Sequence, residues 1–194
     1  MKRILSLVCV TMLTVAASAQ ITWNAKGGVG LATCWGDAEG LKTHFVGKAG
    51  VGIEKPLSSN LSLMPSLELA WKGAKAGEDT WEQQLDIFYL QAPIVFAYRL
   101  NLTDTWNLAL KAGPYFAYAI SDHFEEKENG IVNEKESGDA DVDKFDAGLD
   151  IGIDFEHHRF VFGVEAEMGF IPLWKGNDSK TYNLAFYATI GWKF

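Results

Sequence analysis

Hydrophobic and polar residues alternate with a period of two along most of the chain after residue 21. This alternation is typical of β-strands that have one apolar face and one polar face. The pattern predicts eight strands, near residues 22–35, 44–54, 61–72, 86–100, 106–121, 145–156, 159–171 and 182–194. No internal repeat or domain boundary interrupts this pattern, so we expect one all-β domain.

The connections between the predicted strands alternate in length. Those after the second, fourth and sixth strands are short: 55–60, 101–105 and the His157-His158 turn. Those after the first, third and fifth strands are longer and more polar: 36–43, 73–85 and 122–144. Outer-membrane β-barrels show this asymmetry, with short periplasmic turns and longer extracellular loops. Segment 122–143 contains nine acidic residues and two lysines, and we expect it to be a mobile, solvated loop.

One face of every predicted strand carries no Asp, Glu, Lys or Arg, counted in the strand 86–100 from Phe88 to Leu100. In the last strand, for example, this face runs through alternate residues from Tyr182 to Phe194. Aromatic residues on this face collect at the strand ends, as expected where amphipathic rings lie at membrane interfaces. The expected periplasmic ring is Trp23, Tyr98, Trp106, Phe155, Phe160, Trp192 and Phe194, and the expected outer ring is Trp35, Phe45, Trp71, Phe88, Tyr118, Phe145, Phe170 and Tyr182.

The opposite face carries charges of both signs in equal number. The basic residues are Lys26, Lys48, Lys72, Arg99, Lys111, Arg159 and Lys193, and the acidic residues are Glu54, Glu68, Asp146, Asp150, Asp154, Glu165 and Glu167. If this charged face were turned toward lipid, each basic residue near the bilayer midplane would cost roughly 2–4 kcal/mol. The sum exceeds the free energy of unfolding of an ordinary domain, about 5–15 kcal/mol. The charged face is therefore predicted to line the interior, as a network of ion pairs.

These features together predict an eight-stranded antiparallel up-and-down transmembrane β-barrel. Such a barrel is just wide enough for side chains to fill its interior, so we expect a plugged lumen. Small residues on the inner face would leave room for long charged side chains: Gly28, Gly30, Gly50, Gly52, Gly113, Gly148, Gly152, Gly163 and Gly191. Pro65, Pro93 and Pro114 lie within predicted strands, where we expect local bulges because proline lacks a ladder donor.

The N-terminus has the three parts of a secretory signal peptide. Lys2 and Arg3 precede an apolar run over 4–16, and Ala17-Ser18-Ala19 forms a small-residue cleavage site. A transmembrane helix would need about 20 apolar residues, more than this run has. We expect cleavage after Ala19, a barrel domain over 20–194, and a location in the outer membrane of a Gram-negative cell envelope.

The predicted mature chain retains one cysteine, Cys34, so a disulfide framework is excluded. Removal of Lys2 and Arg3 changes the formal net charge from −8 to −10. An acidic chain without a basic tract is a poor nucleic-acid binder, and we expect no such partner.

Several strands resemble a known group of proteins. Residues 88–100 resemble the Leu-x-x-Pro-hydrophobic-x-x-x-Tyr strand of small outer-membrane barrels of the PorT-like and OmpX-like groups. Residues 113–118 resemble the Gly-Pro-Tyr strand of the PorT-like group, and residues 146–152 its Gly-x-x-x-Gly strand. The terminal Phe194 resembles the C-terminal signal read by the barrel-assembly machinery, which the resemblance implies as a partner. The resemblance transfers no catalytic residues.

The chain shows no pattern typical of a catalytic, cofactor or metal site. Asp139, Asp141 and Asp143 are spaced as in a calcium loop with Asp150 at the twelfth position, but Lys144 replaces the required glycine. The glycine-rich stretches 27–30 and 47–52 match no phosphate-binding fingerprint.

A lipid-modifying enzyme would need a Ser–His pair near the outer leaflet. The histidines there are His44 and His123, and Ser121 is close to His123 in sequence alone. We therefore expect no catalytic, cofactor-binding or metal-binding residues, and no cofactor.

The leading interpretation is a monomeric, non-enzymatic outer-membrane barrel that displays surface loops for interaction or envelope integrity. Its expected partners are outer-membrane lipids, the assembly machinery and an extracellular partner bound by loop 122–143. One alternative is a soluble lipocalin-like barrel whose apolar face lines a ligand cavity. The others are a small porin and a lipid-modifying enzyme.

Overall fold

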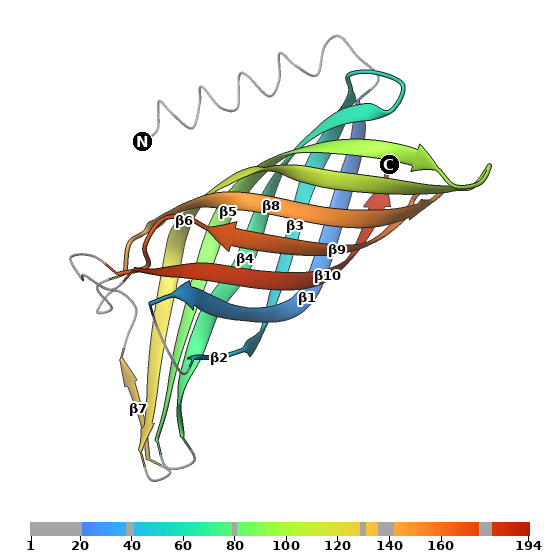
Figure 1. Ribbon diagram of the computed structural model, residues 1–194. Helices are drawn as coiled ribbons and strands as arrows, with labels where there is room; N and C mark the ends of the chain where they lie inside the picture. The colour runs from blue at the N-terminus through green and yellow to red at the C-terminus, as the bar shows by residue number, and fades with distance from the viewer. Residues whose placement is uncertain (1–20, 38–40, 79–80, 129–130, 136–141, 175–179) are drawn as a thin grey trace.

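The computed structural model describes residues 21–37, 41–78, 81–128, 131–135, 142–174 and 180–194. At 41, 78, 81–82, 124–128 and 131–135 it describes the backbone alone. Eight long strands form the barrel (Figure 1): β1 (Thr22–Gly36), β3 (His44–Pro56), β4 (Leu61–Glu78), β5 (Trp81–Asn101), β6 (Trp106–Glu128), β8 (Phe145–His157), β9 (Phe160–Gly169) and β10 (Thr181–Lys193). Two short strands, β2 (Leu41–Lys42) and β7 (Ile131–Lys135), pair with β4 and β6 respectively.

The long strands follow the order β4-β3-β1-β10-β9-β8-β6-β5, and pairing between β4 and β5 closes the barrel. Each neighbouring pair is antiparallel. The predicted eight-stranded antiparallel barrel is confirmed. No helix in the described part of the chain is long and apolar enough to cross a membrane.

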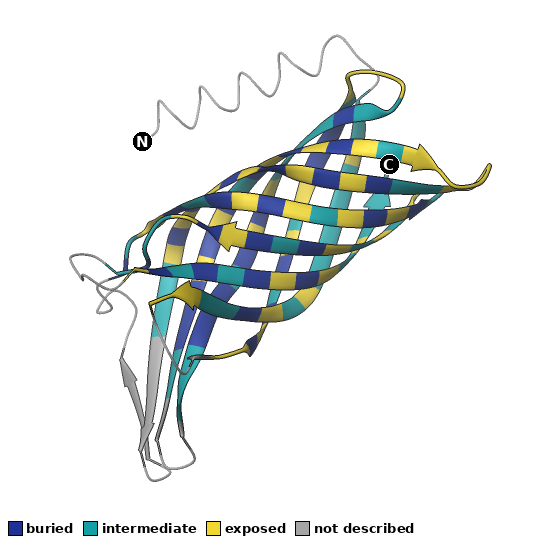
Figure 2. Ribbon diagram, in the orientation of Figure 1, coloured by how far each residue is buried: buried dark blue, intermediate teal, exposed yellow. Residues whose placement is uncertain are grey.

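The two faces of each strand point as the alternation predicts. In β8, Asp146, Asp150 and Asp154 are buried, whereas Leu149 and Ile151 on the other face are exposed. A similar alternation of more buried and more exposed positions can be followed along most of the barrel strands in Figure 2. The charged face therefore lines the lumen, and the apolar face forms the outer surface.

Aromatic residues meet at both ends of the barrel. Trp35 and Tyr182 are paired at one end, with their ring centroids 4.8 Å apart. Phe160 and Trp192 are paired at the other end, where their rings pack edge to face at 4.6 Å. Aromatic side chains at these two levels are typical of the two interfaces of a bilayer.

Three strands are longer than the sequence pattern predicts. The expected loop 73–85 is an extension of β4 and β5, which remain paired as far as Glu78 and Trp81. In the expected loop 122–144, β6 continues to Glu128 and pairs with β7. The loop predictions were therefore wrong over those residues. Strands beyond the bilayer need no apolar face toward lipid, so their sequence lacks the alternation of apolar and polar residues on which the prediction rested. Residues 129–130 and 136–141 of that segment lie outside the described residues.

The predicted proline bulges are not found among the described pairs. Pro65, Pro93 and Pro114 keep the register of their neighbours, with Pro93 opposite Tyr115. The missing donor interrupts the ladder locally without displacing the register on either side. The register shift in the β5–β6 pair lies instead at Phe88/Tyr89, near the outer end of the barrel.

Candidate functional site

The lumen holds a central cluster of charged side chains contributed by six strands. Its lysines come from β1, β3, β4 and β6, and its acids come from β4, β8 and β9. The row on β8 alternates aspartate and glycine, so each aspartate has space beside it. The members of this central cluster are Lys26, Lys48, Lys72, Lys111, Glu68, Asp146, Asp150, Asp154, Glu165 and Glu167.

Lys48 joins three carboxylates at the middle of the central cluster. Its Nζ lies 2.8 Å from Glu167 Oε1 and 3.6 Å from Glu68 Oε2, and it also contacts Glu165 Oε2. Lys72 Nζ binds the other oxygen of Glu167 at 2.7 Å. All five residues are almost completely buried, so these ion pairs are shielded from water and sensitive to the loss of either partner.

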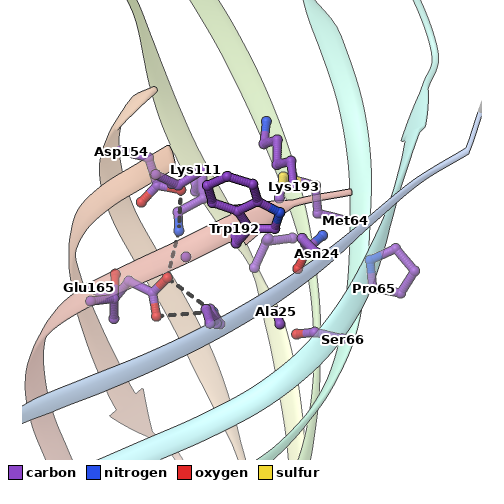
Figure 3. A pocket seen from close by; sticks show the side chains of 15 residues that line it. Asn24, Ala25, Met64, Pro65, Ser66, Lys111, Asp154, Glu165, Trp192 and Lys193 are labelled. Carbon is purple, nitrogen blue, oxygen red and sulfur yellow. Dashed lines mark hydrogen bonds and ion pairs between the residues drawn. The ribbon is translucent and has the colours of Figure 1, made fainter. Parts of the chain in front are cut away.

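Lys111 links the central cluster to Asp154. Its Nζ lies 2.7 Å from Asp154 Oδ2 and 2.5 Å from Glu165 Oε1, as Figure 3 shows. The lining of an adjacent cavity of about 40 Å³ includes Asn24, Ser66 and Lys193 as well as these three residues. A space of this size holds about one or two water molecules.

A second group lies toward the short-turn end of the lumen and consists of Arg99, Lys193, Glu54, Glu156 and Ser62. We name it the periplasmic cluster after the side to which the sequence pattern assigns the short turns. Arg99 binds Glu156 in a bidentate manner, with Nε–Oε2 and Nη2–Oε1 distances of 2.9 and 3.0 Å. Lys193 Nζ lies 3.0 Å from Glu54 and 2.8 Å from Glu156. The two basic and two acidic groups of the periplasmic cluster balance one another.

An apolar cap covers the central cluster on the opposite side. Val142 and Leu173 are buried against Tyr89 and Tyr115, and Trp174 packs against this group. The segments that carry Val142 and Trp174 are joined by a β-bridge. Below the cap, the Tyr115 hydroxyl donates a hydrogen bond of 2.9 Å to Asp146 Oδ2. Along the described lumen, the apolar cap, the central cluster and the periplasmic cluster therefore follow one another.

A further polar group lies at the outer rim, around Asp86. Asp86 shares the phase of Phe88 on β5, but it is buried. The indole Nε1 of Trp71 donates a hydrogen bond of 2.9 Å to Asp86 Oδ1, and His44 Nε2 lies 3.5 Å from the same oxygen. The His44 and Trp71 rings pack edge to face at 5.6 Å. His44 and Trp71 thus surround the Asp86 carboxylate. The sequence pattern did not predict this contact, because it identified Asp86 only as the first residue of the strand 86–100.

The predicted balance of lumen charges is corrected at two positions. Arg159 lies in the exposed β8–β9 turn, because the turn is formed by His158 and Arg159. Glu156 faces inward and joins the periplasmic cluster, although the sequence interpretation omitted it. The described inward-facing charges are therefore six basic and eight acidic. The strict alternation of β8 was a sufficient signal to find Glu156.

Inner-face glycines leave room for charged side chains as predicted. A Cβ at Gly152 would lie 3.0 Å from Glu165 Cγ and 3.1 Å from Lys111 Cε. A Cβ at Gly163 would overlap Asp154 Oδ1. Side chains at these two positions would displace the members of the central cluster.

The described residues considered for other chemistry fall into two groups, one at the β8–β9 turn and one around Asp86, which His44 also approaches. His157 ends β8 and stacks on Trp106 at 4.5 Å, and His158 forms the following turn. Ser121 and His123 lie on β6 opposite Phe88 and Asp86 respectively. Asp139 and Asp141, from the candidate calcium loop, lie outside the described residues.

Comparison with known proteins identifies the family. Residues 18–175 match the family described as the outer membrane protein beta-barrel domain. The chain belongs to this family. The match covers most of the chain and includes every barrel strand except β10. No curated protein sequence matches the chain.

Solved structures with this outer-membrane barrel fold are similar over nearly their whole length. Neisserial surface protein A is 9% identical, with a TM-score of 0.51 over 89% of this chain and 97% of that chain. OprG from Pseudomonas aeruginosa is 10% identical, with a TM-score of 0.51 over 91% and 96%. Ail of Yersinia pestis is 12% identical over 89% and 98%, with a TM-score of 0.48.

Family membership and the two faces of the strands exclude the soluble alternative. A lipocalin-like barrel would enclose the apolar face and expose the charged face to water. Here Leu67 and Ile151 are exposed, whereas Lys48, Asp150 and Glu165 are enclosed. The chain is an outer-membrane β-barrel protein, and its apolar outer surface is suited to acyl chains.

Proposed function

We propose that this outer-membrane barrel is a non-enzymatic display protein with a closed lumen. In this proposal the barrel anchors a rigid sheet outside the cell, and that sheet binds an extracellular partner. The partner, the orientation and the closed lumen are all parts of the proposal.

The observation that carries the proposal is the continued strand pairing beyond the outer aromatic ring. Trp71 and Phe88 face each other in that ring, and the β4–β5 ladder continues from there to Glu78 and Trp81. Seven further residues at about 3.3 Å each carry β4 roughly 23 Å past the ring. β6 and β7 continue the same sheet, which projects from one end of the barrel in Figure 1.

A preformed sheet is well suited to recognition because little conformational entropy is lost when it binds. Segment 122–143, of which residues 122–128 and 131–135 contribute to this sheet, is strongly acidic in composition. This acidity favours a partner with basic groups and would accelerate its encounter with the sheet.

The filled lumen supports an anchoring role over transport. The central cluster, the periplasmic cluster and the apolar cap succeed one another along the lumen, and the cavity beside Glu165 measures only about 40 Å³. A conducting barrel would need a continuous water-filled passage.

Photo-cross-linking on intact cells tests the display role. A photoreactive residue at Gln83, in the projecting sheet, is expected to give a discrete protein adduct. The same residue at Asp104, in the β5–β6 turn, should not give this adduct. Failure to form any protein adduct at Gln83 in the natural growth environment would contradict the proposal.

A shortened variant provides the matched control. Ala74 and Leu85 are directly opposite in the ladder, so residues 75–84 can be replaced by Asn-Gly, a two-residue hairpin turn. This variant should still migrate as a heat-modifiable barrel from the outer-membrane fraction but should lose partner binding. Retention of full binding would show that the sheet is not the binding element.

A further inference from the structure

The central cluster contains more acidic than basic groups. Its four lysines face six carboxylates, whereas the periplasmic cluster is balanced. The surplus of two negative charges lies in a closed interior, where uncompensated charge is strongly unfavourable. A positive species other than a lysine is therefore needed there.

Asp150 has no lysine within ion-pair distance among the described residues; Asp146 also lacks one, but its Oδ2 accepts hydrogen bonds from Tyr115 and Asn183. Asp150 is only 2% exposed, and its Oδ1 has no hydrogen-bond partner among the described residues. By contrast, Glu165 and Glu167 each contact two or more lysines. A buried carboxylate oxygen without a partner loses its hydration and gains nothing in exchange.

The strand register brings Asp150 against two other acids. Asp150 is directly opposite Glu167 in the β8–β9 ladder, and Glu165 is opposite the neighbouring Gly152. Like charges that face each other across a ladder are destabilising unless something bridges them. One carboxylate oxygen from each of Asp150, Glu165 and Glu167 lies within 4.8 Å of the other two. Two oxygens that bind one Ca²⁺ at 2.3–2.6 Å are at most about 5 Å apart, so a single ion can reach all three.

We propose that Asp150, Glu165 and Glu167 form a binding site for one hard divalent cation inside the lumen. An all-oxygen set of ligands selects hard cations such as Ca²⁺, Mg²⁺ or Mn²⁺. The charge of one such ion equals the surplus of the central cluster. The proposal revises the expectation from sequence, which found no metal site, because the three acids converge only through the strand register.

The lysines limit where the ion binds but do not exclude it. Lys48 contacts Glu165 and Glu167, and Lys72 contacts Glu167, so the ion must approach these acids from the side of Asp150. Each carboxylate oxygen has two lone pairs and can bind an ammonium group and a cation together. The 40 Å³ cavity, whose lining includes Glu165 but neither Asp150 nor Glu167, provides space for water on one side of Glu165.

Direct titration with Mn²⁺ tests the site. The mature barrel, folded in detergent micelles and freed of cations with a chelator, is titrated while electron paramagnetic resonance measures free Mn²⁺. One Mn²⁺ is expected per barrel, displaced by Ca²⁺ but not by Na⁺. Loss of a residue that only supports a metal ligand weakens metal binding roughly 10- to 100-fold. Asp150→Asn removes a ligand itself, so it should weaken Mn²⁺ binding at least as much. Asp104→Asn, which changes an exposed acid in the β5–β6 turn, should leave binding unchanged.

A stability measurement keeps the proposal testable if either variant folds poorly. Saturating Mn²⁺ should raise the denaturant midpoint of the wild-type barrel and leave that of Asp150→Asn unchanged. Without cations, Asp150→Asn should have the higher midpoint of the two, because it lacks the uncompensated charge.

Three results would each overturn the proposal. One is a heat-modifiable wild-type barrel that binds no Mn²⁺ at millimolar concentration. Another is stabilisation of the wild type by lower pH but not by Mn²⁺, which would show that Asp150 takes up a proton instead. The third is that the double variant Asp139→Asn/Asp141→Asn loses Mn²⁺ binding while Asp150→Asn retains it. That result would place the ion in segment 122–143 instead of the lumen.

Discussion

At the scale of single residues, Lys48 connects more acids than any other basic residue of the described lumen. It contacts Glu68, Glu165 and Glu167, which lie on two strands at opposite sides of the barrel. Its ammonium group also lies 4.7 Å from the centre of the Tyr187 ring. The stability of the barrel should therefore depend strongly on this one side chain.

Lys48→Met should lower the free energy of unfolding by about 3–5 kcal/mol, because it leaves buried carboxylates without their shared partner. Reversible denaturant unfolding, followed by the heat-modifiable gel shift, measures the change. Lys42→Met alters an exposed lysine of β2 and should change the free energy of unfolding by less than about 0.5 kcal/mol. Equal stability of the two variants would contradict the assigned role of Lys48.

Gly163→Ala should destabilise the barrel by about 1–3 kcal/mol, because the new methyl group would displace Asp154 from its position beside Lys111. Gly27→Ala is the matched control. Gly27 is on the outer face, and the nearest atom to a Cβ there is the Lys48 carbonyl oxygen at 3.8 Å. Unfolding midpoints of the two variants test the prediction, and an undiminished midpoint for Gly163→Ala would count against it.

The sequence could predict which residues face the lumen but not which of them meet. Alternation assigns Asp150 and Glu167 to the inner face, since that face must exclude lipid. Their direct opposition depends on the β8–β9 register, which the short His158-Arg159 turn sets. Contacts across the lumen, such as that of Lys48 with Glu167, depend in addition on the tilt of the strands in the closed barrel.

At the scale of elements, the bilayer explains both the success and the failure of the sequence pattern. Within the bilayer, one face of each strand must be apolar, so the eight strands were predictable to within a few residues at most ends. Beyond it, β4, β5 and β6 continue with both faces free to be polar. The segment Gly73-Ala74-Lys75-Ala76-Gly77 therefore resembles a loop although it is paired with β5.

A lysine placed on the lipid-facing row should have an effect that depends on depth. Ala188 lies in the middle of β10, and Ala25 lies opposite Trp192 at the periplasmic aromatic ring. In a lipid bilayer, Ala188→Lys should cost about 2–4 kcal/mol and Ala25→Lys only about 0–1 kcal/mol. Unfolding from liposomes measures both, and equal costs would contradict the assigned position of the bilayer.

At the scale of the whole molecule, the eight long strands close into a barrel, and the proposed function requires that side chains fill its interior. Charged clusters occupy the middle and one end of the lumen, and the apolar cap of Val142, Leu173 and Trp174 covers the other end. In planar bilayers we expect no stable single-channel opening. A reproducible opening on the order of a nanosiemens, typical of wide water-filled barrels, would contradict the filled lumen.

The central claim is that the uncharged face of the strands contacts lipid while the charged face is enclosed. Spin labels at Val51, Ile151 and Ala188, in a Cys34→Ser background reconstituted into liposomes, test it most directly. All three labels should collide frequently with oxygen, which dissolves in acyl chains, and rarely with a water-soluble nickel complex. Labels that favour the nickel complex, or that are immobilised in a packed interior, would contradict the claim.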